Sequence, residues 1–333
     1  MNVNALFCLL VVVFCSCWNV PPQSELHFGT ICTINLYDKG TRKLYQSIFN
    51  RFNEIEDHLS ANKAGTDIAK VNAAAGIAPV VVHEDTFTVT EAALRYAESS
   101  GGAFDPTIGP LVQLWNIGFN DAHVPAQQEI DYTLPLVDFR DLQLNSEQSS
   151  IYLPRLGMKL DLGAITKGYA ADEAVRIARE AKSPRGVINL GGNVYAFGVK
   201  KDGSPWNIGI KDPLEEDSIV GIAEVRNKTI VTSGVYERFF EADGMRYHHI
   251  LSPVDGYPAR TGLLSTTIIA DRSLDGDALS TAVFVLGYER GHQLIESIPG
   301  IDAIFVFEDM SIRGTAGVIE SFTLTNELFR VRK

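Results

Sequence analysis

Ser273 to Ala282 carries oxygen-bearing side chains at a spacing that could bind a cation. It reads Ser-Leu-Asp-Gly-Asp-Ala-Leu-Ser-Thr-Ala, so the Asp277 carboxylate precedes the Thr281 hydroxyl by four residues. In a helix, residues four apart lie on the same face, and the two groups converge. Mg²⁺ prefers hard oxygen ligands and usually takes one or two carboxylates, with water and substrate phosphate completing its shell. The alternative is that Asp277 only caps a helix while Thr281 packs.

A second candidate is the run from Met158 to Ala170, where an apolar segment turns through Gly163-Ala164 into a helical pattern. The start of such a helix presents free backbone N–H groups that can meet phosphate. Lys167 would add a positive charge at that point. Because strand, glycine turn and helix occur together in many proteins, this run alone does not distinguish a phosphate site from ordinary structure.

The adjacent pair His248 and His249 supplies a candidate proton acceptor. Neighbouring residues of a strand point to opposite faces, so at most one of them enters a given site. Neither a cysteine nor a third histidine lies at metal-ligand spacing, which argues against zinc. One histidine could therefore be a general base near neutral pH, and the alternative is a hydrogen-bonded residue at a strand end.

The run Gly101-Gly102-Ala103-Phe104-Asp105-Pro106-Thr107 combines a glycine turn, an aromatic ring and a carboxylate. A flat ligand could lie against such backbone. The alternative is a helix stop followed by an Asp-Pro turn.

These segments must be positioned by alternating helices and strands. Apolar residues at spacings of three and four predict a helix over Thr41–Ser60, and a second is expected over Asp85–Ser99 with Asp85 as its cap. Further helices are predicted at Thr166–Ala181, Asp277–Leu286 and Glu289–Ile298. Strands are predicted around Cys32, where a buried and inert thiol is expected, and at Met158–Leu162, Gly186–Leu190, Trp206–Ile210, Ile219–Val225, Thr229–Val235, Arg246–Ile250 and Ala303–Phe307.

The bulk composition of the 333 residues is that of a soluble globular protein, with 45% hydrophobic and 21% charged residues. The formal charge of −12 argues against a general affinity for nucleic acid, because no basic stripe is available to displace counterions. With no repeat or evident linker, the pattern predicts one compact α+β unit with an antiparallel or mixed sheet and flanking helices.

The N-terminus has the pattern of an export signal. The apolar run Ala5–Phe14 is too short to span a membrane, and a small residue, Ser16, precedes Cys17 as at a bacterial lipoprotein cleavage site. We therefore expect a signal peptide at 1–16, a lipid on Cys17, a tether over 17–26 containing Pro21-Pro22, and the folded domain at 27–333. The alternative is an ordinary secretory signal, since no Lys or Arg precedes the apolar run. The lipid would hold the protein at the periplasmic face of the inner membrane.

Six runs in this order resemble the ApbE-type flavin transferases, in their bacterial lipoprotein form, over nearly the whole mature chain. They are Gly102-Ala103-Phe104-Asp105-Pro106-Thr107, Leu160-Asp161-Leu162-Gly163-Ala164-Ile165-Thr166-Lys167-Gly168, Asn189-Leu190-Gly191-Gly192-Asn193, Thr232-Ser233-Gly234, His249-Ile250-Leu251-Ser252-Pro253 and Asp277-Ala278-Leu279-Ser280-Thr281-Ala282.

The resemblance implies a single large two-lobed, T-fold-like domain that uses Mg²⁺ and FAD as substrate. Such an enzyme attaches FMN through a phosphoester to a threonine or serine of a target flavoprotein, typically a subunit of an Rnf- or Nqr-type complex, and releases AMP. The implied roles are Ala164, Asp277 and Thr281 as metal ligands, His249 as the group that assists the hydroxyl, and Phe28, Ala103, Phe104, Asp105, Asp161, Lys167 and Leu251 as FAD contacts.

Two positions depart from the family pattern. Phe28 stands before Gly29-Thr30 where a methionine is common, and Ser60-Ala61-Asn62 replaces Ser-Thr-Tyr. Asn62 cannot stack on a flat ring of FAD as an aromatic would, so we expect water to reach the phosphorus and FAD to be hydrolysed to FMN and AMP as well. Three functions remain open at this point: FMN transfer to a protein, an FAD pyrophosphatase, and a non-catalytic flavin-binding lipoprotein.

Overall fold

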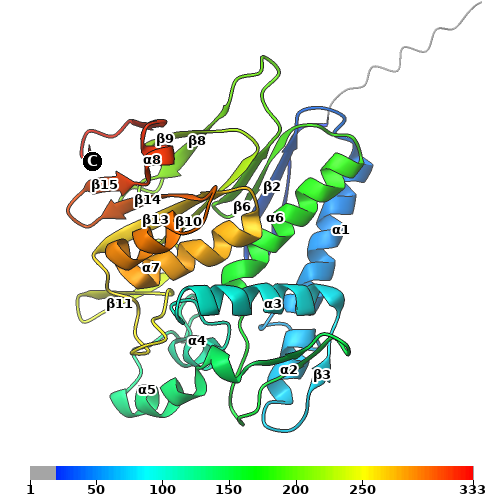
Figure 1. The fold of residues 1–333 in the computed structure, drawn as a ribbon, viewed down its shortest axis with the longest axis vertical. Coiled ribbons are helices and arrows are strands. Elements are labelled where there is room, and N and C mark those ends of the chain that lie inside the picture. The colour runs from blue at the N-terminus through cyan, green and yellow to red at the C-terminus, as the bar shows by residue number, and fades with distance from the viewer. Residues whose placement is uncertain (1–19, 333) are drawn as a thin grey trace, which may run out of the picture.

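The computed structural model describes residues 20–332, and Figure 1 shows their fold. The helices are α1 (Arg42–Leu59), α2 (Asp67–Ala73), α3 (Glu84–Ser99), α4 (Gly109–Trp115), α5 (Gln127–Thr133), α6 (Gly163–Glu180), α7 (Ser273–Glu296) and α8 (Ala316–Ile319), with short 3₁₀ turns η1 (Leu134–Leu136) and η2 (Phe139–Asp141). The strands are β1 (Gln23–His27), β2 (Thr30–Leu36), β3 (Val80–Val81), β4 (Gln143–Asn145), β5 (Ser150–Tyr152), β6 (Gly186–Leu190), β7 (Asn193–Phe197), β8 (Trp206–Lys211), β9 (Ile219–Val225), β10 (Lys228–Gly234), β11 (Phe239–Ala242), β12 (Met245–His248), β13 (Leu263–Ala270), β14 (Asp302–Phe307), β15 (Ser311–Gly314), β16 (Phe322–Leu324) and β17 (Arg330–Val331).

One large sheet organises the molecule, in the order β1-β2-β6-β7-β10-β13-β14-β15-β17. Its neighbouring strands pair antiparallel except β15 and β17, which are parallel, so the sheet is mixed. Helices α6 and α7 pack on one face, as Figure 1 shows, and the small sheet β16-β9-β8 packs on the other. The predicted α+β class with a mixed sheet and flanking helices is confirmed.

The cores on the two faces follow from the sequence pattern. In α1 the predicted stripe of Leu44, Ile48, Phe52, Ile55 and Leu59 is buried, and the Thr41 hydroxyl caps the helix by accepting from the Leu44 N–H. Strand β13 is buried on both sides because α7 covers one face and the small sheet covers the other. A strand covered on both faces loses the polar alternation of an exposed one.

Cys32 in β2 is fully buried, as predicted. Burial raises the pKa of its thiol to about 12, which keeps it protonated and unreactive at neutral pH.

The predicted Asp85 cap is wrong. Helix α3 begins one residue earlier, and the His83 ring accepts from the Asp85 N–H. The Asp85 carboxylate instead binds Arg51 of α1 at 2.6 Å, also accepting from the Tyr169 hydroxyl. A buried charge-assisted pair between helices outcompetes a local cap for this side chain.

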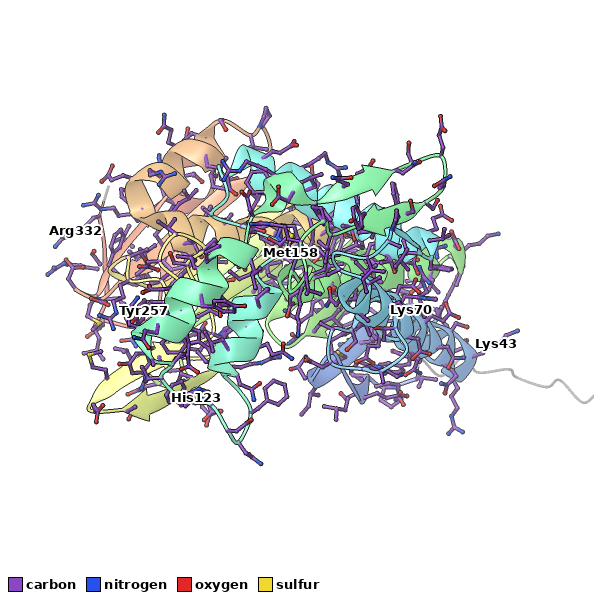
Figure 2. All side chains as sticks on the ribbon, turned by 90° about the horizontal axis from the view of Figure 1, so that it is seen from below. Lys43, Lys70, His123, Met158, Tyr257 and Arg332 are labelled. Atoms are coloured by element: carbon purple, nitrogen blue, oxygen red, sulfur yellow. The ribbon has the colours of Figure 1, made fainter. Side chains whose placement is uncertain are left out.

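The predicted strand over Met158–Leu162 is not a strand. The segment is extended but makes only one isolated bridge, between Lys159 and Ile108. No neighbouring strand is available, and the side chain of Asn72 serves the same purpose, donating to the Leu160 carbonyl at 3.0 Å and accepting from its N–H at 2.7 Å. Figure 2 shows Met158 near the middle of the molecule, where it is fully buried.

Two boundaries also differ from prediction. The two helices expected at Asp277–Leu286 and Glu289–Ile298 are confirmed as the two parts of α7, which meet at the non-helical Gly287 with a φ of 73° that no L residue adopts easily, but α7 begins four residues earlier than predicted, at Ser273. The tether expected over 17–26 ends earlier, because Gln23–His27 forms β1. The prolines at 21 and 22 precede this edge strand, where their missing N–H groups cost no ladder bond.

The segment predicted as a signal peptide, 1–16, and the predicted lipid attachment residue Cys17 lie outside the described residues. Within residues 20–332, no helix has both the length and the apolar character needed to cross a membrane.

Candidate functional site

Helices α6 and α7 approach each other most closely at the two predicted motifs. A Cβ added at Gly168 would lie 2.3 Å from the backbone oxygen of Ser273, so only glycine allows this contact. At this crossing the Gly168 N–H donates to Asp277 Oδ2 at 2.8 Å. A regular helix would direct that N–H at the carbonyl of Ala164, four residues earlier. Asp277 therefore sits beside the first turn of α6, where Ala164 is half-buried.

Asp277 is a second-turn residue of α7, not a cap, so the alternative of a simple capping role is wrong. Its side chain is only 4% exposed, and Lys167 Nζ lies 3.7 Å from Oδ1. A nearly buried carboxylate costs free energy unless it is paired. Here one backbone N–H and one ammonium group support it.

Hydroxyl groups from β10 and α7 meet next to this carboxylate. Ser233 Oγ lies 2.8 Å from Ser280 Oγ and 3.5 Å from Thr281 Oγ1, and the Ser280 hydroxyl donates to the Asp277 carbonyl at 2.9 Å. The Thr232-Ser233-Gly234 run, noticed in the sequence without a role, thus orients the α7 hydroxyls.

The start of α7 is fixed by Asp172 of α6, which the sequence reasoning missed. Its carboxylate accepts from the N–H of Ser273 at 2.7 Å and of Leu274 at 3.0 Å, while the Ser273 hydroxyl donates to the Asn193 side chain at 2.6 Å. Burial raises the pKa of Asp172 to about 6. Free N–H groups at a helix start require such acceptors, and this acceptor comes from a distant segment that no local pattern reveals.

Asp161 ends the extended segment that enters α6. Its N–H donates to the Pro106 carbonyl at 2.9 Å, and its Oδ1 accepts from the Gly163 N–H at 2.8 Å. Burial raises the pKa of this carboxyl, and the nearby Arg238 charge opposes that shift. These contacts join the predicted loop at 101–107 to the predicted turn at 163.

The three residues predicted from the glycine-rich loop are buried, with Ala103 at 7%, Phe104 at 3% and Asp105 at 8% exposure. The Asp105 carboxylate accepts from the N–H and hydroxyl of Thr107 and from the N–H of Phe139. Burial raises its pKa. Because its side chain is engaged within the loop, any ligand contact here would be made by the backbone.

The two histidines separate as the strand pattern requires. His248 is buried, its Nε2–H donating to the Ala259 carbonyl at 3.0 Å, and burial lowers its pKa to about 4. His249 Nδ1 lies 3.2 Å from the Arg238 carbonyl, which can only accept, so Nδ1 carries the proton and Nε2 keeps its lone pair. Burial and then the Arg238 charge lower the pKa of His249 to about 3, with Lys167 also contributing. His249 is therefore a neutral proton acceptor on which the charges of both Arg238 and Lys167 act.

The remaining predicted FAD contacts, Leu251, Phe28 and Asn62, differ in how far they are buried. Leu251 is buried and bridges to Pro258. Phe28 turns the β1–β2 hairpin with a φ of 53°, uncommon for a bulky residue, and packs edge-on against Phe52 at 5.5 Å. Asn62 is exposed just after α1, and its backbone N–H donates to the Ser60 hydroxyl at 3.3 Å.

Arg238 is the second site residue that the sequence reasoning missed. It lies in the loop between β10 and β11, only four residues after Gly234 of the recognised run, and its charge reaches both Asp161 and His249. The available signal was its position shortly after a family-like run.

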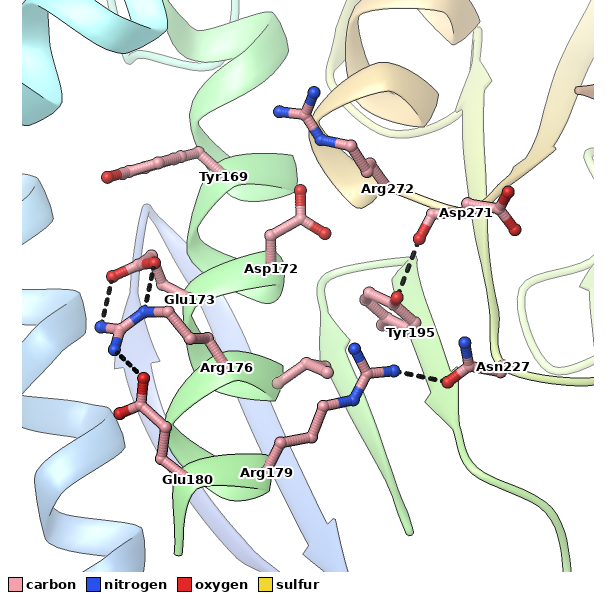
Figure 3. A pocket seen from close by; sticks show the side chains of 11 residues that line it. Tyr169, Asp172, Glu173, Arg176, Arg179, Glu180, Tyr195, Asn227, Asp271 and Arg272 are labelled. Atoms are coloured by element: carbon pink, nitrogen blue, oxygen red, sulfur yellow. Dashed lines mark hydrogen bonds and ion pairs between the residues drawn. The ribbon is translucent and has the colours of Figure 1, made fainter. Parts of the chain in front are cut away.

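A separate open groove of about 570 Å³ lies along α6, as Figure 3 shows. None of the residues predicted from sequence lines it. Its charges are largely paired internally: Arg176 binds Glu173 and Glu180, and Arg179 donates to Asn227. Its half-buried member Asp172 accepts from the first N–H groups of α7, so one side of this groove holds the start of that helix.

The oxygen-rich centre fits a magnesium ion better than a transition metal. Among residues 20–332, no group of three or more His, Cys, Asp or Glu side chains is placed to hold a metal. Magnesium does not need such a group, because one or two carboxylates with water and phosphate suffice. Asp277 supplies one nearly buried carboxylate, and Thr281 of the same helix and the start of α6 at Ala164 carry the other oxygen groups that were predicted as ligands.

Comparison with known proteins identifies the family. The ApbE family model matches residues 28–305. An FAD:protein FMN transferase from Treponema pallidum is 41% identical over 327 residues, covering 92% of this chain and 90% of the relative, and one from Klebsiella pneumoniae is 38% identical over 290 residues, covering 87% and 90%.

Solved structures agree. The ApbE protein of Thermotoga maritima superposes with a TM-score of 0.81 at 34% identity, covering 87% of this chain and 95% of that one. The flavin transferase ApbE from Vibrio cholerae gives 0.77 at 26% identity, covering 91% and 96%. The predicted resemblance is confirmed: this chain belongs to the ApbE family, and its enzyme class is that of the FAD:protein FMN transferases.

Proposed function

We propose that the chain uses Mg²⁺ to transfer FMN from FAD to a threonine or serine hydroxyl of an acceptor flavoprotein, with release of AMP. The observation that carries this proposal is the nearly buried Asp277 carboxylate, held between the Gly168 N–H and Lys167 and one helical turn before Thr281.

The metal would be held by Asp277, Thr281 and the carbonyl of Ala164. When bound, Mg²⁺ supplies positive charge to the diphosphate oxygens as the transferred group departs. Lys167 adds a fixed positive charge at the same place, because its ammonium group lies 3.7 Å from the Asp277 carboxylate. In a chain of net charge −12, an anionic substrate needs this local concentration of cations.

In the transfer step, one oxygen on the FMN phosphorus is exchanged for another. The acceptor oxygen forms a bond to the FMN phosphorus, the bond from that phosphorus to the bridging oxygen breaks, and AMP leaves with that oxygen. The hydroxyl proton passes to His249 Nε2, which is unprotonated because Nδ1–H donates to the Arg238 carbonyl. The depressed pKa makes the ring a weak base, so it accepts the proton as the new bond forms.

Water can take the place of the acceptor hydroxyl, and we propose FAD hydrolysis to FMN and AMP as a second activity. The motivating residue is Asn62, which is exposed and carries no ring to cover a flat ligand. Replacing Asn62 by Tyr should slow AMP release in the absence of an acceptor. Equal rates in the two proteins would refute the idea.

We also propose that the acceptor is a subunit of an Rnf- or Nqr-type electron-transport complex and that the enzyme is lipid-anchored through Cys17 at the periplasmic face of the inner membrane. Both proposals rest on the sequence. Labelling with a radioactive fatty acid should mark the parent and not Cys17→Ser, and labelling of both would contradict the anchor.

The function is tested by incubating purified protein with FAD, Mg²⁺ and a candidate acceptor. Flavin fluorescence fixed to the acceptor after denaturation means transfer. Free FMN and AMP alone mean that the chain is mainly an FAD pyrophosphatase, and intact bound FAD means a non-catalytic carrier. Either of the last two results contradicts the leading proposal.

A further inference from the structure

The backbone of Arg238 is fixed against the candidate proton acceptor. Its carbonyl accepts from the His249 N–H at 3.0 Å and from His249 Nδ1–H at 3.2 Å. Two bonds to one residue hold the loop between β10 and β11 in a defined position next to the site. The same two contacts fix the main chain at Arg238 and select the tautomer of the histidine.

The Arg238 side chain runs over two glycines. A Cβ added at Gly118 would lie 3.2 Å from Arg238 Cδ, and one added at Gly29 would lie 3.5 Å from Nη2. Both glycines have positive φ, so larger residues are disfavoured along this path. The guanidinium therefore ends beside the Phe28-Gly29 turn, a predicted FAD contact, and its charge acts on Asp161 and His249.

The guanidinium has no partner of its own in the described part of the chain. It makes no ion pair or side-chain hydrogen bond there, and the residue is exposed. The other arginine of this region, Arg246, is engaged, because it pairs with Glu241 at 3.2 Å and covers the Phe239 ring. The nearby Lys167 is held by Asp277. Arg238 is thus the unpaired cation next to the centre.

We propose that Arg238 binds a phosphate group of the flavin dinucleotide, which rests on the proposed function. A guanidinium presents a planar fork of donors that matches two phosphate oxygens. The substrate diphosphate carries two negative charges in a site that already contains the carboxylates of Asp161 and Asp277, with His249 neutral. Lys167 and the proposed Mg²⁺ together supply three positive charges against these four negative ones, so the Arg238 guanidinium would bring the site to neutrality.

The test compares Arg238→Gln and Arg238→Lys with the matched control Arg246→Gln, which removes an equal charge from the adjacent hairpin. Binding of FAD, ADP and riboflavin is measured by calorimetry in the presence of a chelator, so that no turnover occurs. We expect Arg238→Gln to weaken FAD and ADP about tenfold to a hundredfold and to leave riboflavin, which has no phosphate, unchanged. Arg238→Lys should recover part of the loss, and Arg246→Gln should bind all three like the parent.

Kinetics with Mg²⁺ supply an independent reading. A phosphate contact present before and during the reaction should raise KM for FAD more than it lowers kcat. Unchanged FAD binding in Arg238→Gln overturns the inference, and an equal loss for riboflavin overturns it by placing Arg238 on the flavin ring. Failure of the parent itself to bind FAD would instead contradict the proposed function, so the two failures are distinguishable.

Discussion

Replacing Gly168 by Ala probes the contact that brings the two halves of the candidate site together. The added methyl would stand 2.3 Å from the Ser273 oxygen and 2.7 Å from Leu274 Cα, both backbone atoms that cannot rotate away. Ordinary van der Waals contact begins at 3.4 Å, so α6 and α7 must separate by about 1 Å. That movement stretches the bond from the Gly168 N–H to Asp277.

Two effects decide the outcome for stability. Overpacking costs about 1–3 kcal/mol, and the better helix propensity of alanine returns about 1 kcal/mol. The protein should therefore lose no more than about 2 kcal/mol of unfolding free energy and remain folded. A 1 Å displacement of reacting groups costs about 10²-fold in rate, so turnover should fall much more than stability.

Gly276→Ala is the matched comparison, one residue before Asp277. Its added methyl would meet Val231 Cγ2 at 2.9 Å and Thr229 Cγ2 at 3.2 Å, which are side-chain methyl groups rather than backbone atoms of the facing helix. AMP release from FAD and thermal unfolding should be measured for the parent and both variants. We expect a loss of about 10²-fold in Gly168→Ala and only a small effect in Gly276→Ala. If Gly168→Ala turns over FAD like the parent, the close approach does not set the site geometry.

Three further outcomes follow from the titrating groups. Because burial and the Arg238 charge lower the pKa of His249 to about 3, a pH–rate profile of kcat/KM should show no acid limb near pH 6.5 from this residue, and a His249-dependent limb there would contradict the assignment. Burial raises the pKa of Asp172 to about 6, so the native state binds more protons than the unfolded state between about pH 4 and 6, and this group's contribution to stability falls as pH rises through that window. The melting temperature of Asp172→Asn should therefore depend less on pH over this range than that of the parent. An equal pH dependence in the two proteins would refute this assignment. Since burial raises the pKa of Cys32 to about 12, native alkylation at pH 8 followed by peptide mapping should leave Cys32 unmodified, and rapid labelling would show that the thiol is accessible.

Local periodicity was enough to predict the elements that carry the core. The spacing of apolar residues predicts the stripe of α1 from Leu44 to Leu59 and the strands β6, β9 and β10. The observed bounds of these elements lie within a residue or two of the predicted ones. Predictions failed where a residue far away in the sequence provides the hydrogen-bond partner. Asp85 pairs with Arg51 across helices, and Asn72 replaces a neighbouring strand for Leu160.

The candidate site divides in the same way. Asp277 and Thr281 could be paired from their helical spacing, and the ordered motifs tied them to Asp161, Lys167 and His249. The roles of Asp172 and Arg238 could not be predicted from spacing. Asp172 contacts Ser273, which lies 101 residues away in the sequence, and Arg238 contacts His249, which lies 11 residues away. Spacing also could not predict which of His248 and His249 is the proton acceptor. The structure distinguishes them, because His248 donates to the Ala259 carbonyl through Nε2 and His249 donates to the Arg238 carbonyl through Nδ1.

The central claim is that a single divalent cation binds at Asp277. The most direct test measures AMP release from FAD as a function of Mg²⁺ concentration in the parent and in Asp277→Ala. Flavin binding is measured in the same proteins to show that the pocket is intact. We predict saturable dependence on Mg²⁺ in the parent and a loss of about 10³-fold in the variant while FAD still binds. Equal turnover in the two proteins, or turnover in the parent that persists under a chelator, would contradict the account.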